Sequence, residues 1–589
     1  MMGKKKDVFI LGITGLTHAF HDNSACLTKN GRVVFAASEE RYSRIKHDRN
    51  FPKLSIRQAL SFGRIRKSQI DYVAVGYPKR FFLQPFLGKN FLDLIRLLIE
   101  LMKGRKLLFF VDIAGILLGE LGQNSFIWSK TDFPEKKVIF IDHHLAHAAS
   151  AYFLGGMKKC LAVVMDAFGP KTSGKLISGA VFLCEDGKII RQLDETGVSS
   201  SIGLFYTSVT QALGFTPGDG EGKTMGLAAY GKPDPAYRAL REIAPIFNKD
   251  KWKKTDYWAQ MFFSTRKEFR LIFDSLPLGK YLKNLIDHYG KENVAASAQK
   301  ILEEESVKYF QHLVYTHEVS NFALAGGLFL NVKMNKRISE VKGIEKIFVH
   351  PNAGDGGTAV GAALYIYSDK FGYKKFPEPV EDVSWGSGYS EKEILLALKK
   401  FKNKTEFKKF HNIAKEVANR ILEGKVVGWF QGRFEWGPRA LGYRSVLVDP
   451  RRMDIKDKLN NTLKNREWFM PFAPSIMDEY GKDYFLNYAK SPFMTMAFNV
   501  KKEKVKNIRA AIHVDNTARP NSVTKKSNPL YYQVIKEFQK LSGVPAVLNT
   551  SFNKHGLPIV NSPEDAINHL FWNCIDELAI GDYLVKRSQ

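Results

Sequence analysis

Residues 138–150 read Val-Ile-Phe-Ile-Asp-His-His-Leu-Ala-His-Ala-Ala-Ser, and they indicate how the first part of the chain folds. The four apolar residues predict a strand that leads directly into a helix. On that helix His143 and His147 stand four residues apart and project from one face. Two neutral imidazoles on one face can hold a divalent transition metal if carboxylates arrive from elsewhere. The alternative is a polar helix start with one hydrogen-bonded histidine.

Hairpins precede and follow this stretch. The first is closed by an Asn30-Gly31 turn and the second by a turn at 185–187. Because the plan of hairpin and then helix occurs twice, we expect an α/β fold with an actin/hexokinase/Hsp70-like two-lobed domain. Such a domain places a nucleotide between its halves. The predicted strands are 7–13, 25–28, 33–37, 72–75, 161–165, 180–184 and 188–190.

Length and composition bound the class of protein. A chain of 589 residues is too long for one hydrophobic core, so two or three domains are expected. The balance of 88 Lys and Arg against 60 Asp and Glu gives a net charge of +28. This charge favours an anionic partner such as a nucleotide, a phosphate ester or nucleic acid, although a solubilising surface gives the same balance. Four widely spaced cysteines, no signal peptide and no membrane-spanning stretch predict a cytoplasmic protein.

The last third of the chain reads as a separate domain. Residues 373–389 have the Pro and Gly content of an interdomain linker. We therefore predict domains at 1–376 and 377–589. In the second, helices are expected at 391–401 and 412–422, and strands at 426–430 and 544–548.

Two carboxylates complete the candidate metal site. Asp166 is expected to end the strand at 161–165, and Asp355 lies in a glycine-rich turn before a helix. With His143 and His147 they form a set of two histidines and two carboxylates, which favours iron, with manganese and zinc as alternatives. Each aspartate taken singly is more typical of a turn residue than of a metal ligand.

Glycine turns are candidates for nucleotide contact, because they let the backbone approach a ligand closely. The run 218–224 does not match a P-loop, since Pro217 occupies the position of its first glycine. It can still form a loop near phosphates, or merely a tight turn. The candidate nucleotide contacts in this domain are Gly326, Gly327, Asn331, Gly354 and Gly356.

The second domain carries a group of candidate anion-binding residues. Arginine forks match phosphate and carboxylate groups bidentately. The Gly, Trp and Pro residues among these arginines favour a shaped pocket over a surface salt-bridge cluster. The candidates are Arg433, Arg439, Arg444, Lys464, Arg466, Ser551 and Asn553.

Taken together, these stretches resemble the NodU/CmcH-type O-carbamoyltransferases from end to end. The resemblance implies a TsaD-like N-terminal domain and a YrdC-like C-terminal domain. The matching runs are 21–25, 39–48, 143–150, 221–231, 352–361, 432–445, 471–474 and 549–553.

The resemblance also implies a two-step reaction. The C-terminal domain would cleave carbamoyl phosphate and join the carbamate to AMP from ATP, with Mg²⁺ able to accompany ATP. The N-terminal domain would then transfer the carbamoyl group to a hydroxyl, with His143, His147, Asp166 and Asp355 as metal ligands. By the same resemblance, His21 and Lys46 become catalytic residues. A Lys ammonium can stabilise charge on the carbamoyl oxygen, and His21 can take the hydroxyl proton.

Some residues depart from the family pattern. Met470 stands where Arg is expected, Tyr443 where Asn is expected, and 166–170 lacks the usual Asp-Gly start. The acceptor stays open among a sugar, a natural product, a polysaccharide and a modified nucleoside in nucleic acid. The main alternative is a threonylcarbamoyl transferase acting on tRNA, which the positive charge also suits. A nucleotide-binding module without enzymatic activity is a third reading.

Overall fold

The computed structural model describes residues 7–15, 22–78, 133–265, 269–464 and 467–588. The chain divides into two compact units. The first comprises Met1–Glu39 and His47–Pro379, and the second comprises Glu40–Lys46 and Val380–Gln589. The short piece Glu40–Lys46, which contains α1 (Glu40–Ser43), thus clusters with the second unit, and the sequence does not predict this.

The first unit contains two five-stranded sheets of the same plan, ordered β3-β2-β1-β4-β5 and β8-β7-β6-β11-β12. In each, three antiparallel strands are followed by two parallel ones. The twofold plan predicted from the hairpins is therefore confirmed. The strands are β1 (Phe9–Ile13), β2 (Ser24–Lys29), β3 (Arg32–Ser38), β4 (Tyr72–Val75), β5 (Val138–Phe140), β6 (Lys159–Pro170), β7 (Leu176–Glu185), β8 (Lys188–Gly197), β11 (Asn321–Ala325) and β12 (Lys346–Val349), with a small ribbon of β9 (Phe247–Asn248) and β10 (Lys251–Trp252).

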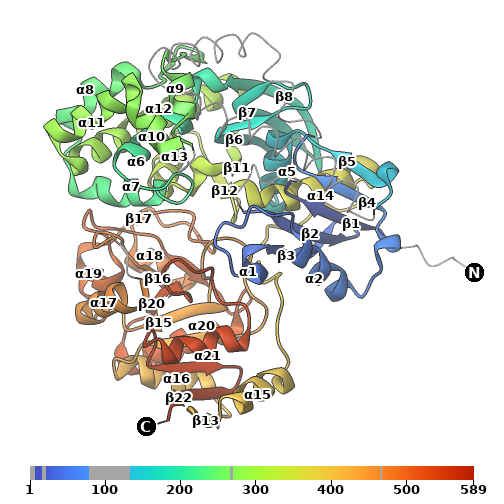
Figure 1. The fold of residues 1–589 in the computed structure, drawn as a ribbon, viewed down its shortest axis with the longest axis vertical. Coiled ribbons are helices and arrows are strands. Elements are labelled where there is room, and N and C mark those ends of the chain that lie inside the picture. Colours follow the sequence, from blue (N-terminus) through green and yellow to red (C-terminus); the bar gives the residue numbers. More distant parts are fainter. Residues whose placement is uncertain (1–6, 16–21, 79–132, 266–268, 465–466, 589) are drawn as a thin grey trace, which may run out of the picture. The chain divides into compact units, whose positions relative to one another are not determined.

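Two helices lie between these sheets (Figure 1). α14 (Thr358–Phe371) packs on β1, β2 and β4, whereas α5 (His143–Gly155) packs on β6, β11 and β12, and the two helices pack on each other. This order of layers places the start of α5 and the start of α14 close together. The other helices are α2 (Lys53–Gly63), α6 (Ile202–Ala212), α7 (Glu221–Leu227), α8 (Asp234–Ile243), α9 (Trp258–Phe262), α10 (Arg270–Ser275), α11 (Pro277–Tyr289), α12 (Lys291–His317) and α13 (Val332–Ser339).

One predicted strand end is wrong. Asp166 does not end its strand, because β6 continues to Pro170. The pairing with β7 shifts register between Met165 and Gly169, so Asp166 lies where the ladder is irregular. Such an irregularity can turn a side chain away from the regular alternation of the strand.

The second unit is built on one eight-stranded sheet, ordered β13-β22-β21-β14-β15-β20-β16-β19. Val427 and Trp429 pack on one face with α16 and α20, whereas Phe430 packs on the other face with α15, α17 and α21. The strands are β13 (Thr405–Lys409), β14 (Val427–Phe430), β15 (Arg444–Val448), β16 (Ala473–Met477), β19 (Asn521–Val523), β20 (Ala546–Ser551), β21 (Glu577–Ile580) and β22 (Tyr583–Arg587), and β17 (Phe498–Asn499) pairs with β18 (Thr517–Ala518). The helices are α15 (Glu391–Lys400), α16 (Ile413–Leu422), α17 (Met453–Leu459), α18 (Gly481–Tyr484), α19 (Val505–Ile508), α20 (Pro529–Ser542) and α21 (Pro563–Phe571).

Candidate functional sites

Four predicted ligands meet in the first unit. His143 and His147 lie one turn apart on α5, and their Nε2 atoms are 3.1 Å apart. Asp166 Oδ2 on β6 lies 3.6 Å from His143 Nε2 and 3.5 Å from His147 Nε2. Asp355 Oδ1, in the turn before α14, lies 3.5 and 3.7 Å from the same two nitrogens. The structure therefore brings the two imidazoles and two carboxylates into one group.

The spacing of these atoms fits a metal coordination sphere. Ligands about 2.1 Å from one ion are separated by about 3.0 Å at a right angle and by about 3.4 Å at the tetrahedral angle. The distances between the two histidines and from each histidine to each carboxylate run from 3.1 to 3.7 Å. Asp166 Oδ2 is also buried without a hydrogen bond, so it has a lone pair for a cation. Nitrogen and carboxylate ligands of this kind suit iron, manganese or zinc.

The charges in the group depend on each other. Burial opposes protonation of His143, but the carboxylates of Asp355 and Asp166 outweigh it and raise the pKa of His143 to about 9. Burial likewise opposes ionisation of both aspartates, but the histidines hold their pKa values below the usual range. Both carboxylates are therefore anionic at neutral pH. His144 shows the contrast, because burial lowers its pKa to about 3 and keeps it neutral.

Predicted glycine contacts lie beside this group. The Gly326 N–H donates to Ala353 O at 2.8 Å, which ties the turn after β11 to the loop that leads to Asp355. A Cβ added at Gly327 would lie 3.1 Å from Asp166 Oδ1, so the backbone here approaches the carboxylate closely. Gly354 and Gly356 flank Asp355 in the chain. The nucleotide-binding role of these glycines stays a prediction.

Asn331 makes structural hydrogen bonds at the start of α13. Its side chain accepts from the Met334 N–H and so caps α13, and it exchanges hydrogen bonds with the Gln299 amide. Any contact with a nucleotide would compete with these bonds. The predicted binding role of Asn331 is therefore not apparent in its contacts.

The two predicted catalytic residues are placed differently. His21 lies outside the described residues. Lys46 is half-buried and belongs to the segment that clusters with the second unit. Both roles stay predictions.

The sequence reasoning missed His47, the neighbour of Lys46. Its Nδ1 lies 2.8 Å from Asp22 Oδ1 and its Nε2 lies 3.4 Å from Asp219 Oδ1. Burial opposes protonation, but the two carboxylates raise the pKa of His47 to about 10, so the imidazole is a cation. The His47 cation therefore forms ion pairs with Asp22 and with Asp219 in the loop before α7. The signal was present, since all three residues lie in or beside the motif stretches.

In the second unit, Lys464 brings Ser551 and Asn553 together. Lys464 Nζ donates to Ser551 Oγ at 2.9 Å and to Asn553 Oδ1 at 2.9 Å. It also donates to the carbonyl oxygens of both residues, at 2.5 and 3.2 Å. Three predicted anion-binding residues thus form one polar group at the end of β20. Arg466 lies outside the described residues.

The arginines of 432–445 bond largely to backbone. Arg444 is fully buried, its guanidinium lies 3.6 Å from the centroid of the Phe430 ring, and it donates to the carbonyls of Gln431, Gly432 and Tyr443. Burial lowers the pKa of Arg444 to about 10. Arg433 donates to the carbonyls of Trp385 and Gly386, and Arg439 is half-buried. Their phosphate contacts stay predictions.

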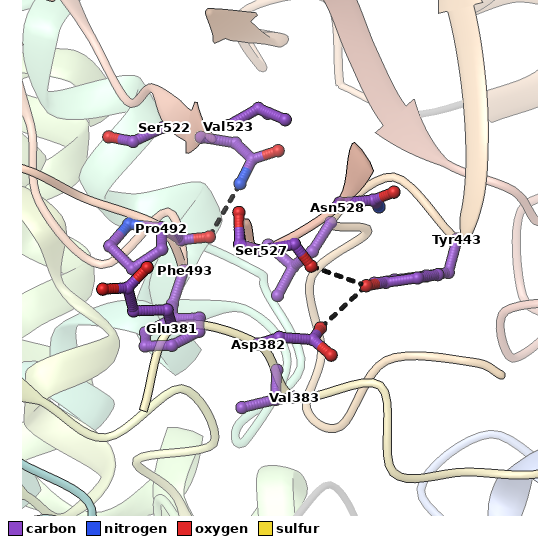
Figure 2. A pocket seen from close by; sticks show the side chains of 12 residues that line it. Glu381, Asp382, Val383, Tyr443, Pro492, Phe493, Ser522, Val523, Ser527 and Asn528 are labelled. Carbon is purple, nitrogen blue, oxygen red and sulfur yellow. Dashed lines mark hydrogen bonds between the residues drawn. The ribbon is translucent and has the colours of Figure 1, made fainter. Parts of the chain in front are cut away.

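A small pocket, partly open to solvent, lies beside Tyr443 in the second unit. Figure 2 shows the Tyr443 hydroxyl directed at Asp382 and at the Ser527 carbonyl, at 2.8 and 3.3 Å. The lining includes Glu381 and Asp382 and no Arg or Lys, and Lys490 and Lys526 pair with Glu381 at 2.9 and 3.9 Å. Tyr443, which stands where the family pattern has Asn, therefore lines a polar, acidic pocket.

Comparison with family models assigns the chain to a protein family. The family models described as Carbamoyltransferase N-terminus and Carbamoyltransferase C-terminus match residues 10–364 and 418–587. The chain belongs to the carbamoyltransferase family. The resemblance to the NodU/CmcH-type enzymes is thereby confirmed, and the family makes this protein a transferase.

Two relatives illustrate the family. Nodulation protein NolNO of Sinorhizobium fredii is 32% identical over 96% of this chain and 79% of its own length. The 3'-hydroxymethylcephem-O-carbamoyltransferase of Streptomyces clavuligerus is 27% identical over 62% of this chain and 64% of its own length. A solved ROK hexokinase from Thermus thermophilus covers 62% of this chain and 100% of its own, with 11% identity and a TM-score of 0.28. That score supports no further argument, so the actin/hexokinase-like class stays a prediction within a mixed α/β fold, as does the YrdC-like class of the second unit.

Within the described residues, we find no helix with the length and apolar character needed to span a membrane.

Proposed function

We propose that this carbamoyltransferase forms carbamoyl-adenylate from carbamoyl phosphate and ATP and transfers the carbamoyl group to a hydroxyl. In the first step, carbamoyl phosphate and water give carbamate and phosphate. The carbamate oxygen then attacks the α-phosphorus of ATP and pyrophosphate leaves. In the second step, the acceptor oxygen bonds to the carbamoyl carbon, the carbon–oxygen bond to AMP breaks, and the hydroxyl proton passes to a base.

The group of His143, His147, Asp166 and Asp355 is the observation that carries the proposal. A divalent ion held there would polarise the carbamoyl oxygen and balance charge in transfer. The two carboxylates and two imidazoles would hold such an ion, and the adenylate is proposed to lie along the Gly326-Gly327 turn, whose backbone approaches Asp166 closely. His21 is the proposed base and Lys46 the proposed cation at the carbamoyl oxygen, both by family resemblance.

The Lys464 group supports the activation step. A buried ammonium held by Ser551 and Asn553 has a fixed position, and a fixed cation stabilises a phosphate without having to be ordered first. Arg439 and Arg433 are proposed as further phosphate contacts. The first unit therefore transfers and the second activates.

A hydroxyl on a small molecule or glycan is the proposed acceptor. The cephem relative, whose name gives a hydroxymethyl acceptor, supports this class. Neither of the two relatives named above supports nucleic acid as acceptor, and the family match does not favour threonylcarbamoylation of tRNA. The +28 charge alone does not outweigh this, because a Lys-rich surface is also explained by solubility.

The test is release of pyrophosphate from ATP by the purified full chain. Release that depends on carbamoyl phosphate supports the proposal, and release that depends on threonine with bicarbonate contradicts it. Asp166→Asn should then lose bound metal and the carbamoylated product while keeping the release of pyrophosphate. His144→Asn is the matched control, because His144 is also buried on α5 but is not one of the four ligands. Equal product from Asp166→Asn and wild type would overturn the metal role.

A further inference from the structure

The segment Glu40–Lys46 is fastened into the second unit by two arginines. Arg41 Nη2 donates to Gly437 O at 3.1 Å, and its guanidinium lies 5.1 Å from the centroid of the Phe434 ring. Gly437 and Phe434 both belong to 432–445, the stretch that carries three candidate arginines. Arg41 is thus a fourth arginine of that stretch in space, although it lies far away in sequence.

Arg44 fastens the segment at a second place. Its guanidinium donates to Ile559 O at 2.7 Å and to Pro558 O at 3.0 Å, and its Nε lies 3.5 Å from Asp565 Oδ1. These acceptors follow the strand that ends at Ser551. The donors of Arg44 are therefore used in fixed contacts, which is typical of a structural residue.

Arg41 differs from Arg44 in how its charge is balanced. Its side chain is 3% exposed, and its Nη1 is buried without a hydrogen-bond acceptor. Among the described residues, no carboxylate lies within 4.0 Å of its guanidinium. A buried guanidinium without a close counter-ion is costly, because burial removes its hydration.

Arg444 also has a buried guanidinium nitrogen without a hydrogen-bond acceptor. Its Nε is buried without an acceptor, and Arg41 is among the charges that oppose its protonation. Glu435 is the main carboxylate acting on both guanidiniums, and its Oε1 already accepts from the Leu441 N–H at 2.7 Å. The two buried guanidiniums thus share Glu435, and although the half-buried Glu40 also favours the charge of Arg41, Arg44 opposes it, so positive charge remains in a low-dielectric region. Such a charge attracts an anion even without touching it.

We propose that Arg41 is a positioning residue of the anion site in the second unit: it holds the 432–445 stretch and adds a buried positive charge toward a bound phosphoryl group. The inference rests on the proposed function, which supplies carbamoyl phosphate and ATP as the phosphoryl substrates. Arg41 acts on the substrate through the field and through the stretch that it fixes, not by contact.

The test separates charge from hydrogen bonding in the full chain. Arg41→Lys keeps the charge, whereas Arg41→Gln keeps an N–H donor on a shorter side chain without charge. We expect Arg41→Gln to raise the KM for carbamoyl phosphate or for ATP about tenfold, and Arg41→Lys to stay within about threefold of wild type. Which KM rises shows which substrate's phosphoryl group lies nearest. Arg44→Lys and Arg44→Gln are the matched control pair. Both should lower thermal stability, and the two variants should change the KM for carbamoyl phosphate and the KM for ATP to the same extent as each other.

Equal KM values for Arg41→Lys and Arg41→Gln would overturn the inference, because a merely structural role does not distinguish them by charge. If Arg41→Gln does not fold, inorganic phosphate serves as the probe with Arg41→Lys and Arg41→Met. Phosphate should raise the melting temperature of wild type and Arg41→Lys but not of Arg41→Met, and equal shifts would refute the role. If wild type releases no pyrophosphate with carbamoyl phosphate, the proposed function fails, and the phosphate titration still decides about Arg41.

Discussion

Substituting Gly361 by Ala should separate the metal ligands without touching one of them. Gly361 lies on α14 where it crosses α5, and a Cβ added there would stand 1.8 Å from Ala146 O and 2.7 Å from Ser150 N. Carbon–oxygen contacts need about 3.3 Å, so the helices must part by about 1.5 Å. Both clashing atoms are backbone, so no side chain can turn away. Overpacking of this kind costs about 1–3 kcal/mol in the free energy of unfolding.

The displacement should matter more for the metal than for the fold. Ala146 lies between His143 and His147 on α5, whereas Asp355 leads into α14. Parting the helices would lengthen the 3.5 and 3.7 Å distances between Asp355 Oδ1 and the two nitrogens to about 5 Å. Two ligands of one ion cannot be farther apart than about 4.2–4.4 Å, twice the metal–ligand distance. Asp355 would therefore drop out of the coordination sphere.

The assay is metal per chain by elemental analysis after dialysis, with urea unfolding of the same samples. Gly361→Ala should fall clearly below wild type in metal content at a urea midpoint that still leaves it folded in buffer. Gly222→Ala is the control, since an added Cβ there meets nothing within 4 Å. A Gly361→Ala protein with wild-type metal content and midpoint would refute the argument from helix spacing.

Three further changes test other parts of the structure. Asp355→Asn should weaken metal binding at least tenfold while leaving pyrophosphate release intact, which competition with a chelator measures. Lys464→Met leaves the side-chain oxygens of Ser551 and Asn553 without their cation, and it should raise the KM for carbamoyl phosphate about tenfold or more; an unchanged KM would remove Lys464 from the site. Burial lowers the pKa of His569 to about 4 in the folded protein. In the unfolded chain the pKa of this histidine is about 6.5. The free energy of unfolding should therefore fall as the pH drops from about 6.5 towards 4, by about 2 kcal/mol at pH 5 from this residue. His569→Gln should lessen that fall in urea midpoints at pH 7.5 and 5, and an identical fall in both proteins would contradict the assignment.

Local pattern predicted several strands of the first unit and the placement of two of the four candidate metal ligands. The apolar run before Asp142 and the four-residue spacing of His143 and His147 follow from helix and strand periodicity, which neighbours in the chain decide. The end of β6 was mispredicted because residues 167–170 read Ala-Phe-Gly-Pro, which looks like a turn. In the structure, β7 pairs with Gly169 and Pro170 beyond the register shift, so a neighbouring strand overrides that local signal.

The contacts of the arginines in the second unit could not be predicted from the sequence. Within 432–445, spacing predicts a cluster, but it does not tell that Arg444 donates to three carbonyls or that Arg433 donates to two. Nor does any spacing rule connect Arg41 with Gly437, which lie 396 residues apart. Whether a guanidinium binds substrate or backbone depends on which acceptors surround it after burial, and this is decided by tertiary packing. The positive charge of this unit therefore comes from residues that lie far apart in the sequence, and a motif within one stretch describes only part of it.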